Sequence, residues 1–226
     1  MNVDKLAAPV VTVLSTAALG YAFSQPIMGS LTFFYVTGGL YFVLALVAVA
    51  RMFRDGTLID MFKWRSGDLA IGVGSALALG LAIHGGRMVL APRMSLKELW
   101  VARLYAQLPE PGVGGQRLLL LIAALAVVSA LMIIAWQGLV QQALEEWLGV
   151  RRGFIVTAVL FALAHAPTIK LCEMPGAGLN PLLVFATLLC GLVWGFLAGR
   201  LQRLGPSLVS SMALAISLVT QFRVWP

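Results

Sequence analysis

Acidic side chains are scarce in this chain, and long hydrophilic stretches are almost absent. Only nine of its 226 residues are Asp or Glu, and all nine lie in or beside the breaks between apolar runs. A charged side chain in the middle of a bilayer costs several kcal/mol, so this placement is expected of a chain that crosses one. Charged residues make up 11% of the chain and hydrophobic residues 60%, whereas about a quarter of the residues of a soluble domain are charged. The composition excludes a soluble globular protein and indicates an integral membrane protein.

Histidine and cysteine are also rare, which narrows the available chemistry. The two cysteines, Cys172 and Cys190, lack the spacing of metal ligands, and we interpret both as structural. The two histidines, His84 and His165, would need a third protein ligand to form a catalytic zinc site. We therefore predict no metal and no cofactor. Anionic lipid head groups are sufficient to explain the net charge of +7, so no nucleic-acid partner is predicted.

Seven apolar runs predict the fold class. A membrane-spanning helix needs about 20 apolar residues, or fewer where neighbouring helices cover it. In the connection between residues 85 and 116, apolar side chains recur at helical spacing, which predicts an amphipathic helix in the interface. The predicted fold is an all-α polytopic transmembrane helix bundle that forms a single membrane domain over residues 1–226. The apolar runs are residues 9–24, 31–52, 69–84, 118–140, 154–166, 181–199 and 208–222.

Small residues recur every four positions on two of these runs. One stripe consists of Gly191, Gly195 and Gly199, and the other of Gly72, Ala76 and Gly80. In lipid, small residues allow two helix backbones to approach closely. Both stripes are therefore predicted to pack against other helices.

Positively charged residues favour one orientation of the bundle. If the N-terminus is cytoplasmic, nine Lys and Arg residues lie on the cytoplasmic side and seven on the other. An excess of Lys and Arg in short loops marks the cytoplasmic side. We therefore predict a multi-pass cell-membrane protein with a cytoplasmic N-terminus.

Two short segments carry a family resemblance. Residues 135–141 read Ala-Trp-Gln-Gly-Leu-Val-Gln, and residues 161–165 read Phe-Ala-Leu-Ala-His. They resemble the CAAX-protease and bacteriocin-processing (CPBP) family, whose first motif is E-E-x-x-x-R-G and whose second is F-x-x-x-H. The resemblance covers about residues 64–222, is nearest to bacterial members, and thus implies the bacterial inner membrane. It also implies a helix bundle with a polar cavity, in which glutamates and histidines of three motifs activate water.

The chain departs from these motifs at the positions of the family's catalytic residues. At the family's spacing, Met132 and Ile133 occupy the positions of the glutamate pair, and Gln137 that of the arginine. Phe161 and His165 match the second motif. The histidine of the third motif falls on Leu214 or Ala215, and the chain has no histidine after His165.

One histidine without an acid is insufficient for peptide hydrolysis. The reaction needs a base to deprotonate water and a group to stabilise the oxyanion. We therefore predict a non-catalytic relative that binds a membrane partner or a protein C-terminal tail in the former substrate cavity, with His165 as a catalytic remnant.

An active endopeptidase with a rearranged site is the alternative, so the sequence leaves enzymatic activity open. Glu145 and Glu146, followed by two arginines, imitate the first motif and would act with His165. Glu145 lies 13 residues beyond Met132, on the order of 20 Å along a helix, which favours a charge-paired helix end instead. A transporter is disfavoured because the sequence has no inverted repeat and no charge in the middle of a span.

Overall fold

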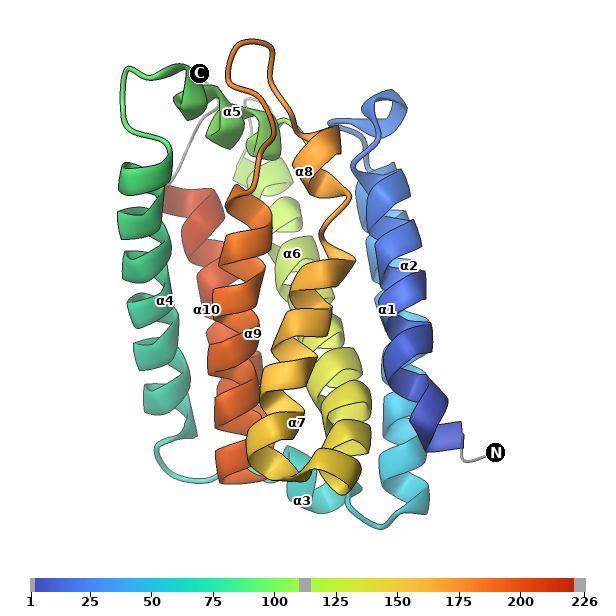
Figure 1. The fold of residues 1–226 in the computed structure, drawn as a ribbon. Helices are drawn as coiled ribbons and strands as arrows, with labels where there is room; N and C mark the ends of the chain where they lie inside the picture. Colours follow the sequence, from blue (N-terminus) through green and yellow to red (C-terminus); the bar gives the residue numbers. More distant parts are fainter. Residues whose placement is uncertain (1–2, 110–114, 222–226) are drawn as a thin grey trace.

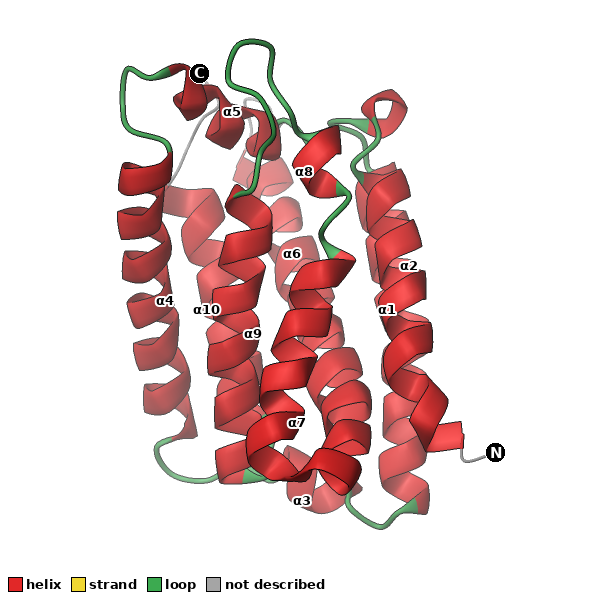
Figure 2. Cartoon of the chain, viewed as in Figure 1, coloured by secondary structure: helices red, strands yellow, loops and turns green. Residues whose placement is uncertain are grey.

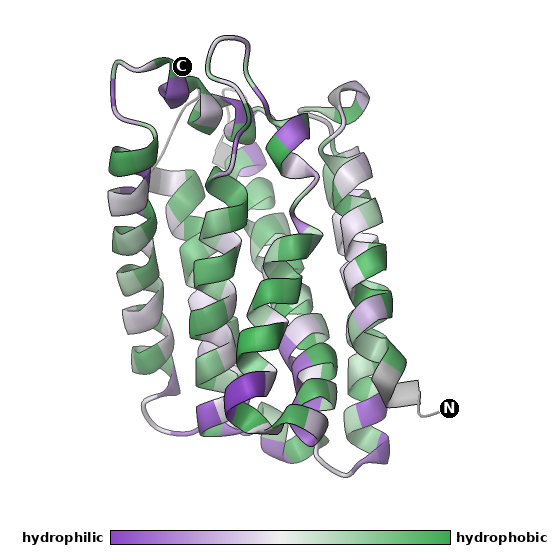
Figure 3. Ribbon diagram, viewed as in Figure 1, coloured by the Kyte–Doolittle hydropathy of each residue, from purple (hydrophilic) through white to green (hydrophobic). Residues whose placement is uncertain are grey.

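The computed structural model describes residues 3–109 and 115–221, and seven long helical rods dominate it (Figure 1). The predicted all-α membrane bundle is confirmed. Hydrophobic residues cover the middle of the rods and hydrophilic ones gather toward their ends (Figure 3). The long helices are α1 (Val3–Ala22), α2 (Thr32–Arg54), α4 (Asp68–Leu90), α6 (Gly115–Ala135), α7 (Gln142–Ala164), α9 (Leu182–Leu201) and α10 (Gly205–Gln221).

Short helices connect these rods at both ends of the bundle (Figure 2). The segment predicted to be an amphipathic helix forms η2 (Leu96–Glu98) and α5 (Leu99–Tyr105), which lie across one end. There Trp100 and Val101 are buried, whereas Leu96 and Leu99 are exposed. The remaining short helices are η1 (Gln25–Ile27), α3 (Leu58–Phe62) and α8 (Thr168–Leu171).

Four helical stretches are long and apolar enough to cross a membrane: 32–54, 68–90, 116–171 and 182–201. The stretch from Gln116 to Leu171 contains two rods because the chain reverses within α7. Gly149 adopts φ 74° and ψ 162°, a conformation that residues with a Cβ rarely take. Beyond it, Gly153 lies so close to Glu145 that an added Cβ would be 2.7 Å from Glu145 Cγ. Eight residues of straight helix would separate these positions by about 12 Å.

The glycine stripes lie where helices approach most closely. On α9, Gly191 faces the Ala158 backbone of α7, where an added Cβ would be 3.0 Å from the Ala158 Cα. Gly195 and Gly199 continue along the same contact toward the Gly149 turn. On α4, an added Cβ at Gly72 would be 2.5 Å from the Val209 side chain of α10. The predicted packing role of both stripes is confirmed.

A buried ion pair fastens α4 to the turn between α9 and α10. Arg203 donates from Nε and Nη2 to the carboxylate of Asp68 at 2.7–3.0 Å, and the two side chains are 9% and 0% exposed. Asp68 also accepts a hydrogen bond from the Arg65 backbone amide at 3.0 Å. A bidentate pair with an additional donor is the geometry in which a buried pair offsets its desolvation.

Substitution of Gly195 by Leu should destabilise the bundle. An added Cβ would already meet Gln141 Oε1 at 3.1 Å and Phe154 Cβ at 3.2 Å, so the larger side chain must separate α9 from α7. We expect a loss of about 1–3 kcal/mol and a lower folded yield in detergent. Gly74→Leu is the control, because an added Cβ there meets nothing within 4 Å. Equal thermal stability of the two variants would contradict the packing argument.

Substitution of Asp68 by Asn should also destabilise the protein, because it leaves the Arg203 guanidinium buried without its counter-charge. Breaking a buried pair on one side costs about 3 kcal/mol or more. The matched control is Asp60→Asn, at an exposed carboxylate near the same end. Thermal unfolding in detergent measures both, and a Tm for Asp68→Asn equal to that of the control would refute the role of the pair.

Candidate functional site

The first motif lies at an irregularity of the helix. Between α6 and α7, residues Trp136–Gln141 form a π-helix, η3, and all six are buried. Short π-helices inside α-helices are frequent at functional sites. Arg51 of α2 donates from Nη1 to the Leu139 carbonyl oxygen of η3 at 3.2 Å, and from Nη2 to Glu146 Oε1 at 2.7 Å. The motif segment is therefore held from the neighbouring helix.

The positions of the family's glutamate pair are occupied by packed apolar side chains. Ile133 is 1% exposed, and Met132 is partly buried against the same core. Gln137, at the position of the arginine, is 3% exposed, and its Oε1 has no hydrogen-bond partner among the described residues. Gln141, one turn further, donates from Nε2 to Glu145 Oε1 at 2.7 Å and to the Gly195 carbonyl oxygen at 2.8 Å.

The second motif forms an aromatic cluster. His165 follows the last residue of α7 and is 6% exposed. Its Nδ1 lies 2.8 Å from the Phe161 carbonyl oxygen, and since a carbonyl can only accept, Nδ1 is the donor. The Phe161 ring packs edge-on against His165 at 4.9 Å and Trp136 at 5.2 Å between centroids. Phe161 and Trp136 thus bring the second motif against the first.

The third-motif positions lie on α10. Leu214 is 3% exposed within the core, and its Cδ1 would be 3.9 Å from a Cβ at Gly80. Ala215 lines a cavity beside it. Of the motif positions, Ala215 lines this cavity. Because Met132, Ile133, Gln137 and His165 occupy positions of the family's catalytic motifs, we predict that they face a common cavity.

Glu145 and Glu146 lie at the other end of α7 from His165. Glu145 contacts Gly153, and twelve residues of helix from there to His165 correspond to about 18 Å. Glu146 is exposed and pairs with Arg51, as expected of a charge-paired helix end. Within residues 3–109 and 115–221, no three His, Cys, Asp or Glu side chains gather closely enough to hold a metal ion.

Both cysteines are buried and free. Burial raises the pKa of the Cys172 thiol to about 11, which keeps it protonated near neutral pH. A protonated thiol is a poor nucleophile, in keeping with the structural interpretation of this residue.

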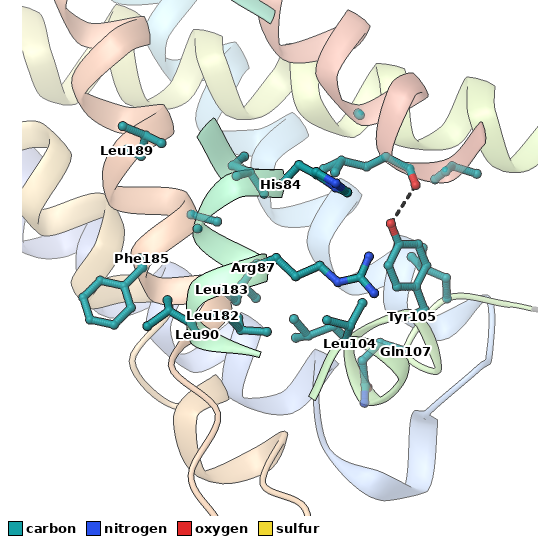
Figure 4. A pocket seen from close by; sticks show the side chains of 18 of the residues that line it. His84, Arg87, Leu90, Leu104, Tyr105, Gln107, Leu182, Leu183, Phe185 and Leu189 are labelled. Atoms are coloured by element: carbon teal, nitrogen blue, oxygen red, sulfur yellow. Dashed lines mark hydrogen bonds between the residues drawn. The ribbon is translucent and has the colours of Figure 1, made fainter. Parts of the chain in front are cut away.

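An apolar cavity at one end of the bundle was not predicted from the sequence. It has a volume of about 390 Å³ and is lined by residues of α2, α4, α5, α6, α9 and α10 (Figure 4). Leu, Ile, Val, Phe and Ala side chains provide most of its wall, and four polar side chains interrupt it: His84, Arg87, Tyr105 and Gln107. In the sequence, these four polar residues flank or belong to the amphipathic segment at one end of the bundle. That position was the only indication of the cavity.

The fold and these motif positions define a class, namely multi-pass membrane proteins built as a helix bundle. Within it, residues 114–216, somewhat under half of the chain, match the family model of type II CAAX prenyl endopeptidase Rce1-like proteins. This match confirms the resemblance to the CAAX-protease family. No curated protein and no solved structure matches the chain.

The two buried glutamines of η3 should respond in opposite ways to substitution by Leu. Gln137→Leu removes a buried acceptor without a partner, so we expect an unchanged or raised Tm. Gln141→Leu removes two hydrogen bonds that link η3 to α7 and α9, and should cost about 1–3 kcal/mol. Thermal unfolding in detergent measures both. If Gln137→Leu lowers the stability as much as Gln141→Leu does, the Gln137 side chain has a stabilising partner, and the expectation is wrong.

Proposed function

We propose that this protein is a non-catalytic member of the CAAX-endopeptidase group that acts by binding. The observation that carries the proposal is the packing of Ile133 into the core, with Met132 beside it, where active members hold their glutamates. Neither side chain can act as a general base or supply the carboxylate oxygens of the family's site. Gln137 replaces the guanidinium of the first motif with a neutral amide. The requirement for a base together with an oxyanion stabiliser is therefore not met at these positions.

The rearranged endopeptidase is the weaker candidate. Its mechanism requires Glu145 and His165 to act on the same peptide bond. Glu145 instead lies against Gly153, which is about 18 Å along α7 from His165. Glu145 also accepts a hydrogen bond from Gln141, and Glu146 is engaged by Arg51. Both carboxylates have structural partners that account for their presence.

The binding role that we propose is capture of a membrane partner or of a protein C-terminal tail in the former substrate cavity. The support is the 390 Å³ cavity that Ala215 lines, which falls within the 300–1,000 Å³ range of small-molecule sites. Three of the helices that line it, α6, α9 and most of α10, belong to the segment that matches the family model.

We place this protein in the cell membrane with a cytoplasmic N-terminus, as one membrane domain over residues 1–226 with a family core at about 64–222. The alternation of the rods puts the nine Lys and Arg residues assigned to the cytoplasm toward the end of the bundle where α2 ends and α4 begins (Figure 1). A bacterial inner membrane is the compartment that the family resemblance favours.

The purified protein should not cleave peptides or membrane-tethered substrates. The triple variant Met132→Glu, Ile133→Glu and Gln137→Arg should not restore cleavage either, because positions 214 and 215 would still lack a histidine. Product analysis by mass spectrometry, with an active family member as the positive control, measures both. Cleavage by the wild type that is lost in His165→Ala or Glu145→Gln would overturn the proposal and favour the rearranged enzyme.

A further inference from the structure

The main cavity has the size and lining of a site for one hydrocarbon chain. Its volume of about 390 Å³ is near the lower end of the range for small-molecule sites, so it suits a single chain better than a two-chain lipid. Apolar side chains from α4, α9 and α10 form most of its wall, among them Leu90, Leu183, Leu189 and Leu218. Phe185 also lines it and is 55% exposed on the outside of the bundle, where lipid would surround it.

Positive charge concentrates at one side of this cavity. Figure 4 shows Arg87 and Tyr105 approaching one another, with His84 nearby on α4. His84 and Arg87 also line a second cavity of about 240 Å³, to which Arg93 contributes another guanidinium. Arg87 pairs with Glu98, whose carboxylate lies 3.8 Å from Nη2 and is partly exposed. The apolar chamber thus shares two lining residues, His84 and Arg87, with a smaller cavity that carries two arginines.

Gln107 provides an independent indication that a ligand is expected here. Its side chain lines the main cavity and is 1% exposed, yet neither Oε1 nor Nε2 has a hydrogen-bond partner among the described residues. A buried amide without partners costs about 1–3 kcal/mol. Its backbone is engaged, because Gly29 donates to the Gln107 carbonyl oxygen at 3.3 Å, which fixes the position from which the side chain extends. A polar group of a ligand would satisfy it.

The selectivity of the cavity for a ligand must come from its polar residues, because the apolar wall does not distinguish one hydrocarbon chain from another. A hydrocarbon chain that leaves the bilayer for this cavity exchanges one apolar surrounding for another, so its burial provides little net free energy. A carboxylate, in contrast, gains charge-assisted hydrogen bonds from a guanidinium in a site of low dielectric. Tyr105 donates its hydroxyl to the Leu218 carbonyl oxygen at 2.7 Å, so we do not assign it to the ligand.

We propose that the cavity binds one long-chain fatty acid anion, with its hydrocarbon chain between α4, α9 and α10 and its carboxylate at Arg87, on the side shared with the smaller cavity. This inference rests on the proposed binding role of the cavity but names a lipid, instead of a protein tail, as the occupant. The ligand reaches the chamber from the bilayer and needs no aqueous carrier.

The test uses the full-length protein, purified in detergent and stripped of lipid. Oleate, its methyl ester and an apolar hexapeptide with a free C-terminal carboxylate are titrated, and bound ligand is counted by native mass spectrometry. We expect one oleate per chain and no binding of the methyl ester above background. Arg87→Ala should weaken oleate binding about tenfold, which corresponds to one charge-assisted hydrogen bond. Arg152→Ala, at an exposed arginine just beyond the Gly149 turn, should leave binding unchanged.

Two further variants separate binding from folding. Ala186→Phe fills the chamber from α9 and should abolish oleate binding while the protein stays folded. Gln107→Leu should weaken oleate binding severalfold without lowering the Tm of the empty protein, because it removes the unpartnered amide. If Arg87→Ala fails to fold, the comparison of oleate with its methyl ester on the wild type still decides the role of the charge.

The outcomes distinguish this inference from the proposed function. Equal binding of oleate and its methyl ester, or equal affinities of Arg87→Ala and Arg152→Ala, would overturn the fatty acid assignment. Displacement of oleate by the hexapeptide at a lower concentration would also overturn it, and would support capture of a protein tail instead. If neither ligand binds the folded wild type, both the inference and the binding role of the cavity fail.

Discussion

The close approach of α7 and α9 is the contact on which the rest of the bundle depends. In a bilayer, helices gain little from hiding apolar surface, so their association relies on backbone contact and on interhelical hydrogen bonds. The α9 stripe supplies both. Gly191 lets the α9 backbone reach the Ala158 backbone, and the Gly195 carbonyl oxygen accepts a hydrogen bond from Gln141. This contact fixes α7 in place and, through Gln141, orients η3 with the degenerate first motif.

Arginine and acidic residues fasten the end of the bundle where polar side chains gather. Arg203 joins α4 to the α9–α10 turn through Asp68, and Arg51 joins α2 to η3 through the Leu139 carbonyl oxygen and to Glu146. The two cavities described above lie at the opposite end, around α5. One end of the bundle is thus fastened by ion pairs, and the other contains these cavities.

Much of this fold could be predicted from the sequence, because apolar runs and glycine spacing act locally. The seven rods, the short helix at residues 99–105 and the packing of Gly191 and Gly72 all followed from these patterns. The π-helix could not be predicted, since one extra residue in a turn leaves no mark on an apolar run. The Asp68 and Arg203 pair needs 135 residues of chain to be placed in three dimensions.

The candidate site was predictable only in part for the same reason. The pairing of Phe161 and His165 follows from a spacing of four on one helix, and the structure places Trp136 against it. Six helices contribute residues to the cavity, and Gln107 is notable because its side-chain amide has no hydrogen-bond partner among the described residues. A sequence pattern cannot show that a buried side chain has no hydrogen-bond partner. Family motifs therefore point to the core of this bundle, whereas its open space lies beside that core.

The π-helix determines the direction in which the side chains that follow it point. A turn that holds one extra residue rotates everything that follows it by about 100° relative to an uninterrupted α-helix. Gln141 and Glu145 lie at or after that turn, and their orientation toward Gly195 and Gly199 depends on it. Deletion of any single residue between Trp136 and Gln141 would restore a regular helix and rotate both side chains away from α9. Insertions and deletions in this segment are thus far more restricted than substitutions, although every residue in it is apolar, glycine or glutamine.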